Sequence, residues 1–120
     1  MSTYVREKVM RTPIEYSEIV EIDGRSRSLF GYGDVGKFQI APTEESYIDY
    51  VIEYEEDVDS EYGKTRALYP REQEKYRPIW QQILPNIDMS KVRLVEFCWY
   101  NCSEAPDYYD DVNDDFYKEI

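Results

Sequence analysis

Residues 46–62, SYIDYVIEYEEDVDSEY, decide the fold that we expect for this chain. Aromatic and aliphatic side chains recur there on alternate positions, interrupted by Glu56, namely at Ile48, Tyr50, Ile52, Tyr54 and Val58. The other parity is mostly acidic. A period of two predicts a β-strand with one face on a core and the other in water. We expect the strand to end near residue 55, where the acidic residues become continuous.

Two other stretches predict long strands. Residues 3–10, TYVREKVM, alternate with Val5 and Val9 on one side. Residues 91–100, KVRLVEFCWY, are apolar on both parities with two exceptions, which is typical of a central strand covered on both faces. Shorter strands are expected at 26–30 and 37–41.

One helix is expected over residues 70–84. Pro70 suits the first helical position, and Glu72 places an acid in the first turn. Apolar side chains then recur at helical spacing, at Tyr76, Ile79, Trp80, Ile83 and Leu84. Pro78 lies inside this pattern and removes a backbone donor, so we expect a kink or two abutting short helices.

The segment between residues 12 and 24 has two interpretations. Thr12, Pro13 and Glu15 form a pattern typical of a helix start. The Asp23-Gly24 pair is instead typical of a hairpin turn, which favours a strand before it. We predict a strand over 17–23.

The fold class predicted from these elements is α+β. We expect one small domain over residues 1–103, an antiparallel or mixed sheet of four to six strands with the kinked 70–84 helix packed on a face. Residues 104–120 form an acidic, aromatic segment, expected to dock on the domain or on a partner. The predicted core is Ile48, Tyr50, Ile52, Ile79, Trp80, Ile83, Val92, Leu94, Val95 and Phe97.

Composition excludes several classes of protein. The chain has 120 residues and no histidine, which removes Ser-His-Asp, Cys-His and His-metal sites. Apolar runs are far shorter than the roughly 20 residues of a membrane helix, and the N-terminus has no apolar signal region. We expect a cytoplasmic protein without cofactor, metal or membrane contact. Cys98 and Cys102 are expected to be reduced thiols in or near the core.

The stretch GYGDVGK at 31–37 contains the glycine spacing of a dinucleotide-binding loop and most of a P-loop. Such loops bind phosphate because they lead into a helix N-terminus. Here FQIAP follows, which suggests a strand cut short by Pro42. We therefore interpret Gly31, Gly33 and Gly36 as positions of positive φ in a hairpin loop or bulge.

Acidic residues are segregated along the chain. There are 26 acidic and 14 basic residues, a net charge of −12, which disfavours direct nucleic-acid binding. No lysine or arginine occurs from 38 to 63 or from 94 to 117. Acids on alternate positions from 53 to 61 lie roughly 7 Å apart if the chain is extended, near the phosphate spacing of one nucleic-acid strand. The alternative is a solvated face that keeps the protein soluble.

The candidate partner-binding carboxylates are Asp49, Glu53, Glu55, Asp57, Asp59, Glu61, Asp107, Asp110, Asp111, Asp114 and Asp115. The candidate aromatic anchors are Tyr54, Tyr62, Tyr108 and Tyr109. Aromatic anchors among selective charges are typical of protein interfaces. Residues 107–115 also offer oxygen ligands for calcium, but lack the order of an EF-hand loop.

These patterns predict a non-enzymatic acidic protein that binds a basic partner. The specific hypothesis is an inhibitor that occupies the nucleic-acid site of a basic enzyme, by analogy with the small acidic proteins that phages and mobile elements make against CRISPR or restriction nucleases. The alternative is an immunity protein against a basic bacterial toxin. A calcium-binding module or a carboxylate enzyme ranks third.

Overall fold

The computed structural model describes residues 2–42, 46–59 and 64–102. In this part the chain forms five strands, β1 (Ser2–Pro13), β2 (Phe38–Ile40), β3 (Tyr47–Glu56), β4 (Lys64–Ala67) and β5 (Arg93–Cys102). The helices are α1 (Tyr16–Arg25) and α2 (Pro70–Trp80), with short 3-10 helices η1 (Arg27–Leu29) and η2 (Met89–Lys91).

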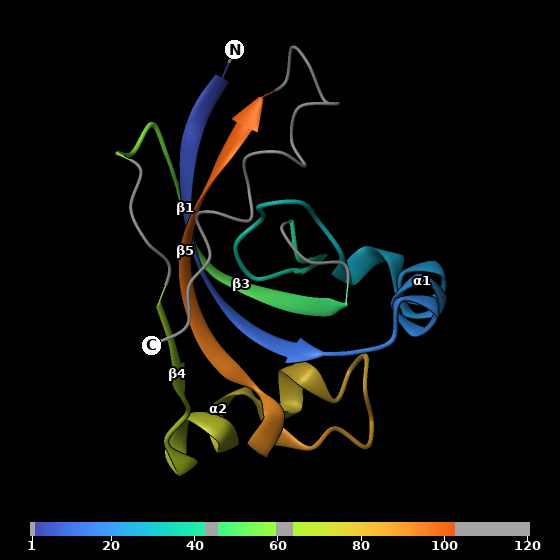
Figure 1. The fold of residues 1–120 in the computed structure, drawn as a ribbon. Helices are drawn as coiled ribbons and strands as arrows, with labels where there is room; N and C mark the ends of the chain where they lie inside the picture. The colour runs from blue at the N-terminus through green and yellow to red at the C-terminus, as the bar shows by residue number, and fades with distance from the viewer. Residues whose placement is uncertain (1, 43–45, 60–63, 103–120) are drawn as a thin grey trace.

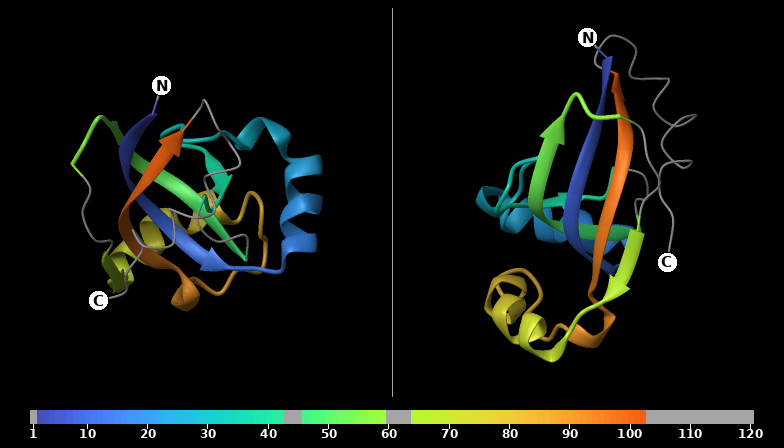
Figure 2. Two further views of the ribbon diagram at one scale, coloured as in Figure 1. Left: turned by 45° about the horizontal axis from the view of Figure 1, so that its top comes forward. Right: turned by 90° about the vertical axis from the view of Figure 1, so that its left-hand side faces the viewer.

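The strands form one sheet in the order β2-β3-β1-β5-β4, with each neighbouring pair antiparallel. The first strand in sequence is thus the middle one, between β3 and β5 (Figures 1 and 2). The predicted α+β class and a sheet of four to six strands are confirmed. The 91–100 segment is confirmed as an interior strand, because β5 has β1 on one side and β4 on the other.

The sheet has two differently covered faces. The helix face carries Met10 and Ile48, which form one buried cluster with Trp80 of α2. The opposite face, here called the loop face, carries a second cluster of Val5, Val9, Val51, Val95, Phe97 and Trp99. Residues opposite one another in antiparallel strands share a face, and the pairs Val5–Trp99 and Val9–Val95 follow that rule.

The ten predicted core residues all belong to these clusters. Six are buried, namely Ile48, Trp80, Ile83, Val92, Val95 and Phe97. The other four pack against the first cluster while partly exposed, namely Tyr50, Ile52, Ile79 and Leu94.

A bulge in β3 overturns the expected one-sided strand. Lys8 is opposite Glu53 and Val9 is opposite Val51, so Ile52 is an extra residue. One inserted residue moves every later side chain to the other face. Tyr54 therefore lies on the loop face, opposite Glu7, and not on the face of Ile48 as expected.

The prediction of a strand over 17–23 is wrong, because these residues belong to α1. Ile19 and Ile22 lie three residues apart and are buried on one side of that helix, which a strand could not achieve. The helix also starts later than the Thr12-Pro13 pattern suggested, since β1 continues through Pro13. The strand predicted at 26–30 is wrong too: η1 occupies most of it, and Phe30 contributes only a single bridge to Phe38.

Helix α2 begins at Pro70 as predicted, and the Glu72 carboxylate accepts a hydrogen bond from the Tyr69 N–H at 3.1 Å. It ends at Trp80, four residues before the expected end. The backbone changes there to hydrogen bonds of the 3-10 type, because the N–H groups of Gln82 and Ile83 donate to carbonyls three residues back. Pro78 therefore lies in the last turn of a single helix.

Acidic margin and the polar network beneath the glycine loop

Five exposed carboxylates lie in the last residues of β3 and in the three residues that follow it. We call them the acidic margin: Glu53, Glu55, Glu56, Asp57 and Asp59. Strand β2 pairs only with residues 48–50 of β3, so the margin lies beyond the part of β3 that β2 covers. Four of the predicted binding carboxylates are in this set, and all four are exposed as expected.

Two carboxylates of the margin form ion pairs with β1. Glu53 lies 3.6 Å from Lys8 and Glu55 lies 3.4 Å from Arg6. Both glutamates are about two-thirds exposed, at 67% and 64%. Exposed ion pairs of this kind contribute about 0.2–1 kcal/mol to stability. Five carboxylates against two bases leave an excess of three negative charges.

The expected straight line of charges is interrupted at Asp57. Strand β3 ends at Glu56, and Asp57 has a φ of 57°, in the left-handed region. The Thr3 hydroxyl donates to the Asp57 carboxylate at 2.7 Å and accepts from the Asp57 N–H at 3.1 Å. The roughly 7 Å spacing of an extended strand therefore applies only to Glu53 and Glu55.

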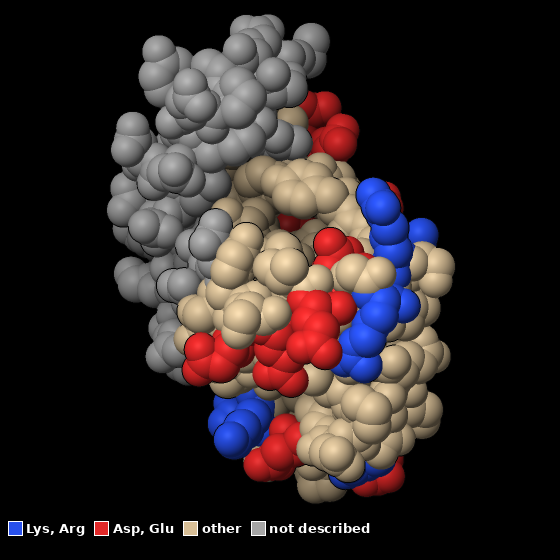
Figure 3. Space-filling model, turned by 90° about the vertical axis from the view of Figure 1, so that its right-hand side faces the viewer, with Lys and Arg blue, Asp and Glu red and all other residues tan. Residues whose placement is uncertain are grey.

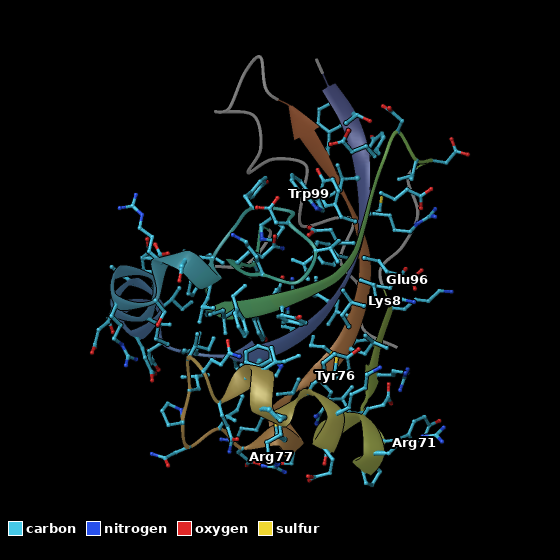
Figure 4. The ribbon with its side chains drawn as sticks, turned by 180° about the vertical axis from the view of Figure 1, so that it is seen from behind. Lys8, Arg71, Tyr76, Arg77, Glu96 and Trp99 are labelled. Atoms are coloured by element: carbon cyan, nitrogen blue, oxygen red, sulfur yellow. The ribbon has the colours of Figure 1, made fainter. Side chains whose placement is uncertain are left out.

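Charges of opposite sign alternate across the strands next to the margin. Lys8 is opposite Glu53 on one side and Glu96 on the other, and Glu96 is opposite Lys64. Figure 4 shows Lys8 and Glu96 projecting from the same side of the sheet, with Trp99 on the other side. On the side of the molecule that carries α1, acidic and basic atoms lie next to one another (Figure 3). The excess negative charge of the margin differs from this mixed background.

Asp49 does not face water, and this expectation was wrong. It is fully buried on the loop face, where it accepts two hydrogen bonds from Arg11, at 2.6 Å from Nε and 2.8 Å from Nη2. The Arg11 guanidinium also lies over the rings of Phe97 and Tyr47, at 4.9 Å and 5.5 Å. Asp49 lies before the bulge, opposite Arg11 and on the covered loop face, whereas the bulge moves Glu53 and Glu55 to the other face. Asp49 therefore supports the fold and is not exposed to a partner.

A second buried carboxylate, Glu7, lies beside this pair. Its two oxygens accept hydrogen bonds from Trp99 Nε1 at 2.7 Å and Gln39 Nε2 at 3.0 Å. Burial raises the pKa of Glu7 to about 7, and the nearby Asp49 carboxylate adds to the increase. The two hydrogen bonds and Arg11 act in the opposite direction. Glu7 therefore holds or releases its proton near neutral pH.

The glycine loop, residues 31–37, lies over this network. Gly33 donates its N–H to Gln39 Oε1 at 2.9 Å, and the Tyr32 ring contacts Trp99 edge-on at 5.5 Å. Positive φ, as expected, occurs at Gly33 (71°) and Gly36 (85°), but Gly31 is not among the positive-φ residues. The loop leads into β2 and not into a helix, so it lacks the helix N-terminus that a phosphate-binding loop uses.

Tyr54 packs under this loop. A Cβ atom added to Gly33 would lie 2.6 Å from the Tyr54 ring, so only glycine allows this approach. The predicted anchor therefore faces away from Glu53 and Glu55. Cys98 is buried, as expected, with its Sγ 3.8 Å from the Asp59 carbonyl oxygen.

Some predicted residues lie outside the described part of the chain. They are Glu61, Tyr62, Asp107, Tyr108, Tyr109, Asp110, Asp111, Asp114 and Asp115. The predictions for the 104–120 segment and for a calcium site at 107–115 remain predictions. Across residues 2–42, 46–59 and 64–102, acidic and cysteine side chains form no cluster able to hold a metal ion. Neither of the described helices is long and apolar enough to cross a membrane.

Sequence reasoning missed Glu7, Arg11, Gln39 and Trp99. A signal was present in the first strand, where Glu7 shares the parity of Val5 and Val9. A charged residue at a core position indicates a buried partner. Gln39 gave no comparable signal, because its role depends on the pairing of β2 with β3.

Comparison with known proteins gives no further identification: no family model, curated protein or solved structure matches this chain.

Proposed function

We propose that this chain is a non-enzymatic protein that binds a basic protein through the acidic margin. The observation that carries the proposal is the excess of exposed carboxylates at Glu53–Asp59 in a segment without lysine or arginine. A field of one sign steers a partner of opposite charge and selects it against acidic proteins.

The specific partner that we propose is a cytoplasmic nucleic-acid-handling enzyme, such as a CRISPR or restriction nuclease. Such an enzyme carries a basic groove, and an acidic surface that fills it competes with DNA or RNA. Because the chain turns at Asp57, the carboxylates do not keep the regular spacing of nucleic-acid phosphates. This form of the proposal therefore rests on the density of negative charge in the margin. The chain would then act as an inhibitor by occupying the groove.

The alternative function, immunity to a basic toxin, uses the same surface. Competition separates the two: DNA displaces an inhibitor from a nucleic-acid groove, whereas an immunity protein bound elsewhere on its toxin stays bound. The remaining interpretation is that the acids form a solvated face that only keeps the protein soluble.

The test is capture of partners from a nuclease-containing bacterial lysate on the immobilised full chain, eluted with a salt gradient. We expect a basic nucleic-acid-binding protein that elutes at moderate salt and is displaced by added DNA, since screening weakens exposed charges. The captured partner is then titrated against variants.

The test variant combines Glu53→Gln, Glu55→Gln and Asp59→Asn, and omits Asp57 because its carboxylate bonds Thr3. The control combines Glu15→Gln, Glu18→Gln and Glu21→Gln on and beside α1, which removes the same charge from exposed positions. We expect about tenfold weaker binding and a shallower salt dependence for the test variant alone. Equal affinity of the two variants for the partner would refute the assignment of the acidic margin as the binding surface.

A further inference from the structure

A pocket of about 260 Å³ opens on the loop face, at the end of the sheet where β1 stops and β5 starts. Four strands contribute to its walls, and Lys91 of η2 lies beside them. The acidic margin is at the other end of β1, opposite residues 5–8. The pocket is therefore a separate feature from the proposed protein-binding surface.

The described residues that line this pocket include three basic side chains and no acidic one: Arg11, Lys91 and Arg93. Arg11 is compensated by Asp49 through the bidentate pair. Lys91 and Arg93 are exposed, and within the described ranges neither forms an ion pair with a carboxylate. In a chain with a net charge of −12, this is a local positive site.

Thr65 adds a hydrogen-bonding group to the pocket. It is 9% exposed, and its Oγ1 has no hydrogen-bond partner in the described structure. It lies opposite Val95 on β5, on the same face as Arg11 and Arg93. A buried hydroxyl without a partner is unfavourable, so such groups usually have a role. An oxyanion would accept its hydrogen bond.

The remaining walls are largely apolar. They come from Pro13, Tyr47 and Val95. Pockets that bind small molecules combine apolar walls with a few convergent polar groups, and this volume lies just below the usual range for drug-sized ligands. The dimensions suit a single ring or a short chain.

We propose that this pocket binds a small organic oxyanion, a carboxylate or a phosphate monoester carried on one apolar ring or chain. Lys91 and Arg93 provide the charge, and Thr65 donates a hydrogen bond to the oxyanion. The apolar body packs against Tyr47 and Pro13. The site is independent of the acidic margin and of the partner proposed for it.

The test is a titration of the full chain with benzoate and with phenyl phosphate, followed through backbone amide shifts in NMR spectra. Benzamide, which has the same ring without charge, is the control. We expect saturable shifts at residues 65, 91, 93 and 95 with at least one of the two anions. The anion that binds more tightly identifies the preferred headgroup, carboxylate or phosphate. Saturation by neither anion, or equal binding of benzamide, would overturn the proposal.

Three variants locate the binding groups. Lys91→Gln and Arg93→Gln should each weaken binding about threefold to tenfold, and Thr65→Val about threefold. Thr65→Val should not impair folding, because the hydroxyl has no hydrogen bond to lose. Arg71→Gln is the matched control, an exposed charge on α2 outside the pocket. Wild-type affinity in all three pocket variants would contradict the site.

Discussion

Strands β1 and β3 carry the same kind of cross-strand ion pair in two different surroundings. Near the acidic margin, Lys8–Glu53 and Arg6–Glu55 are exposed pairs with separations of 3.6 Å and 3.4 Å. Towards the other end, Arg11–Asp49 is a bidentate pair in which both side chains are at most 2% exposed. Each pair joins a basic residue of β1 to an acidic residue of β3, but burial determines which pair the fold depends on.

This comparison divides the carboxylates of β3 by role. Asp49 lies on the loop face and accepts both hydrogen bonds of the buried pair with Arg11, so its removal takes away the bidentate partner of a buried guanidinium. Glu53 and Glu55 contribute little to stability and remain in water. Glu53 and Glu55 are therefore the carboxylates available to the partner that we propose.

The largest effect is expected from Asp49→Asn. The change keeps the side-chain shape but removes the carboxylate of the buried bidentate pair with Arg11, which should lower the free energy of unfolding by about 3–5 kcal/mol. Chemical denaturation followed by tryptophan fluorescence measures it. A loss below about 1 kcal/mol would mean that the pair is not buried as described.

The next effect is a dependence on pH. The pKa of Glu7 rises from 4.5 to about 7 on folding, so the folded state holds this proton more tightly than the unfolded chain does. The contribution of this proton to the free energy of unfolding is complete below about pH 4.5. It is lost as pH rises through about 7, a change of about 3 kcal/mol. The difference in unfolding free energy between wild type and Glu7→Gln, measured from pH 4 to 8, should therefore fall with pH. A difference that stays constant with pH would contradict a raised pKa of Glu7.

A smaller effect concerns the loop that covers the buried network. Gly33→Ala places a methyl group against Tyr54 at a positive φ, and should destabilise the protein by about 2 kcal/mol. Gly24→Ala is the matched control. Its site is open and helical, so it should stabilise by about 0.5–1 kcal/mol. Thermal unfolding compares them, and a similar change in both would disprove the close approach of Gly33.

The smallest effect is expected at the margin. Glu53→Gln and Glu55→Gln should each change the free energy of unfolding by less than about 1 kcal/mol, because their pairs are exposed. The same denaturation series at low and high salt measures these changes. A loss comparable with that of Asp49→Asn would assign these residues to the fold and remove the reason to consider them available.

Much of the fold could be predicted from periodicity. The strand in the 46–62 segment with its end near residue 55, the strand at 91–100 and the start of the 70–84 helix all follow from local patterns. So do the ten core residues. Local patterns failed at α1, where a hairpin-like Asp23-Gly24 pair lies inside a helix because tertiary packing of Ile19 and Ile22 dominates.

The site was less predictable than the fold. The run of acids was visible in the sequence, but Asp49 could not be separated from Glu53 and Glu55. The inserted residue Ile52 puts those two glutamates on the opposite face from Asp49, and a regular alternation does not predict it. The contacts among Glu7, Gln39 and Trp99 join positions up to 92 residues apart. No local pattern specifies such contacts; they follow from strand order and register.

The most direct test of the difference between the two regions is a pair of double-mutant cycles on unfolding free energy. One uses Arg11→Met with Asp49→Leu, and the other Lys8→Met with Glu53→Leu. We predict a coupling energy of about 2 kcal/mol or more for the first pair and below about 1 kcal/mol for the second. Equal coupling in the two cycles would contradict the conclusion that burial separates the carboxylate that the fold depends on from those that contribute little to stability.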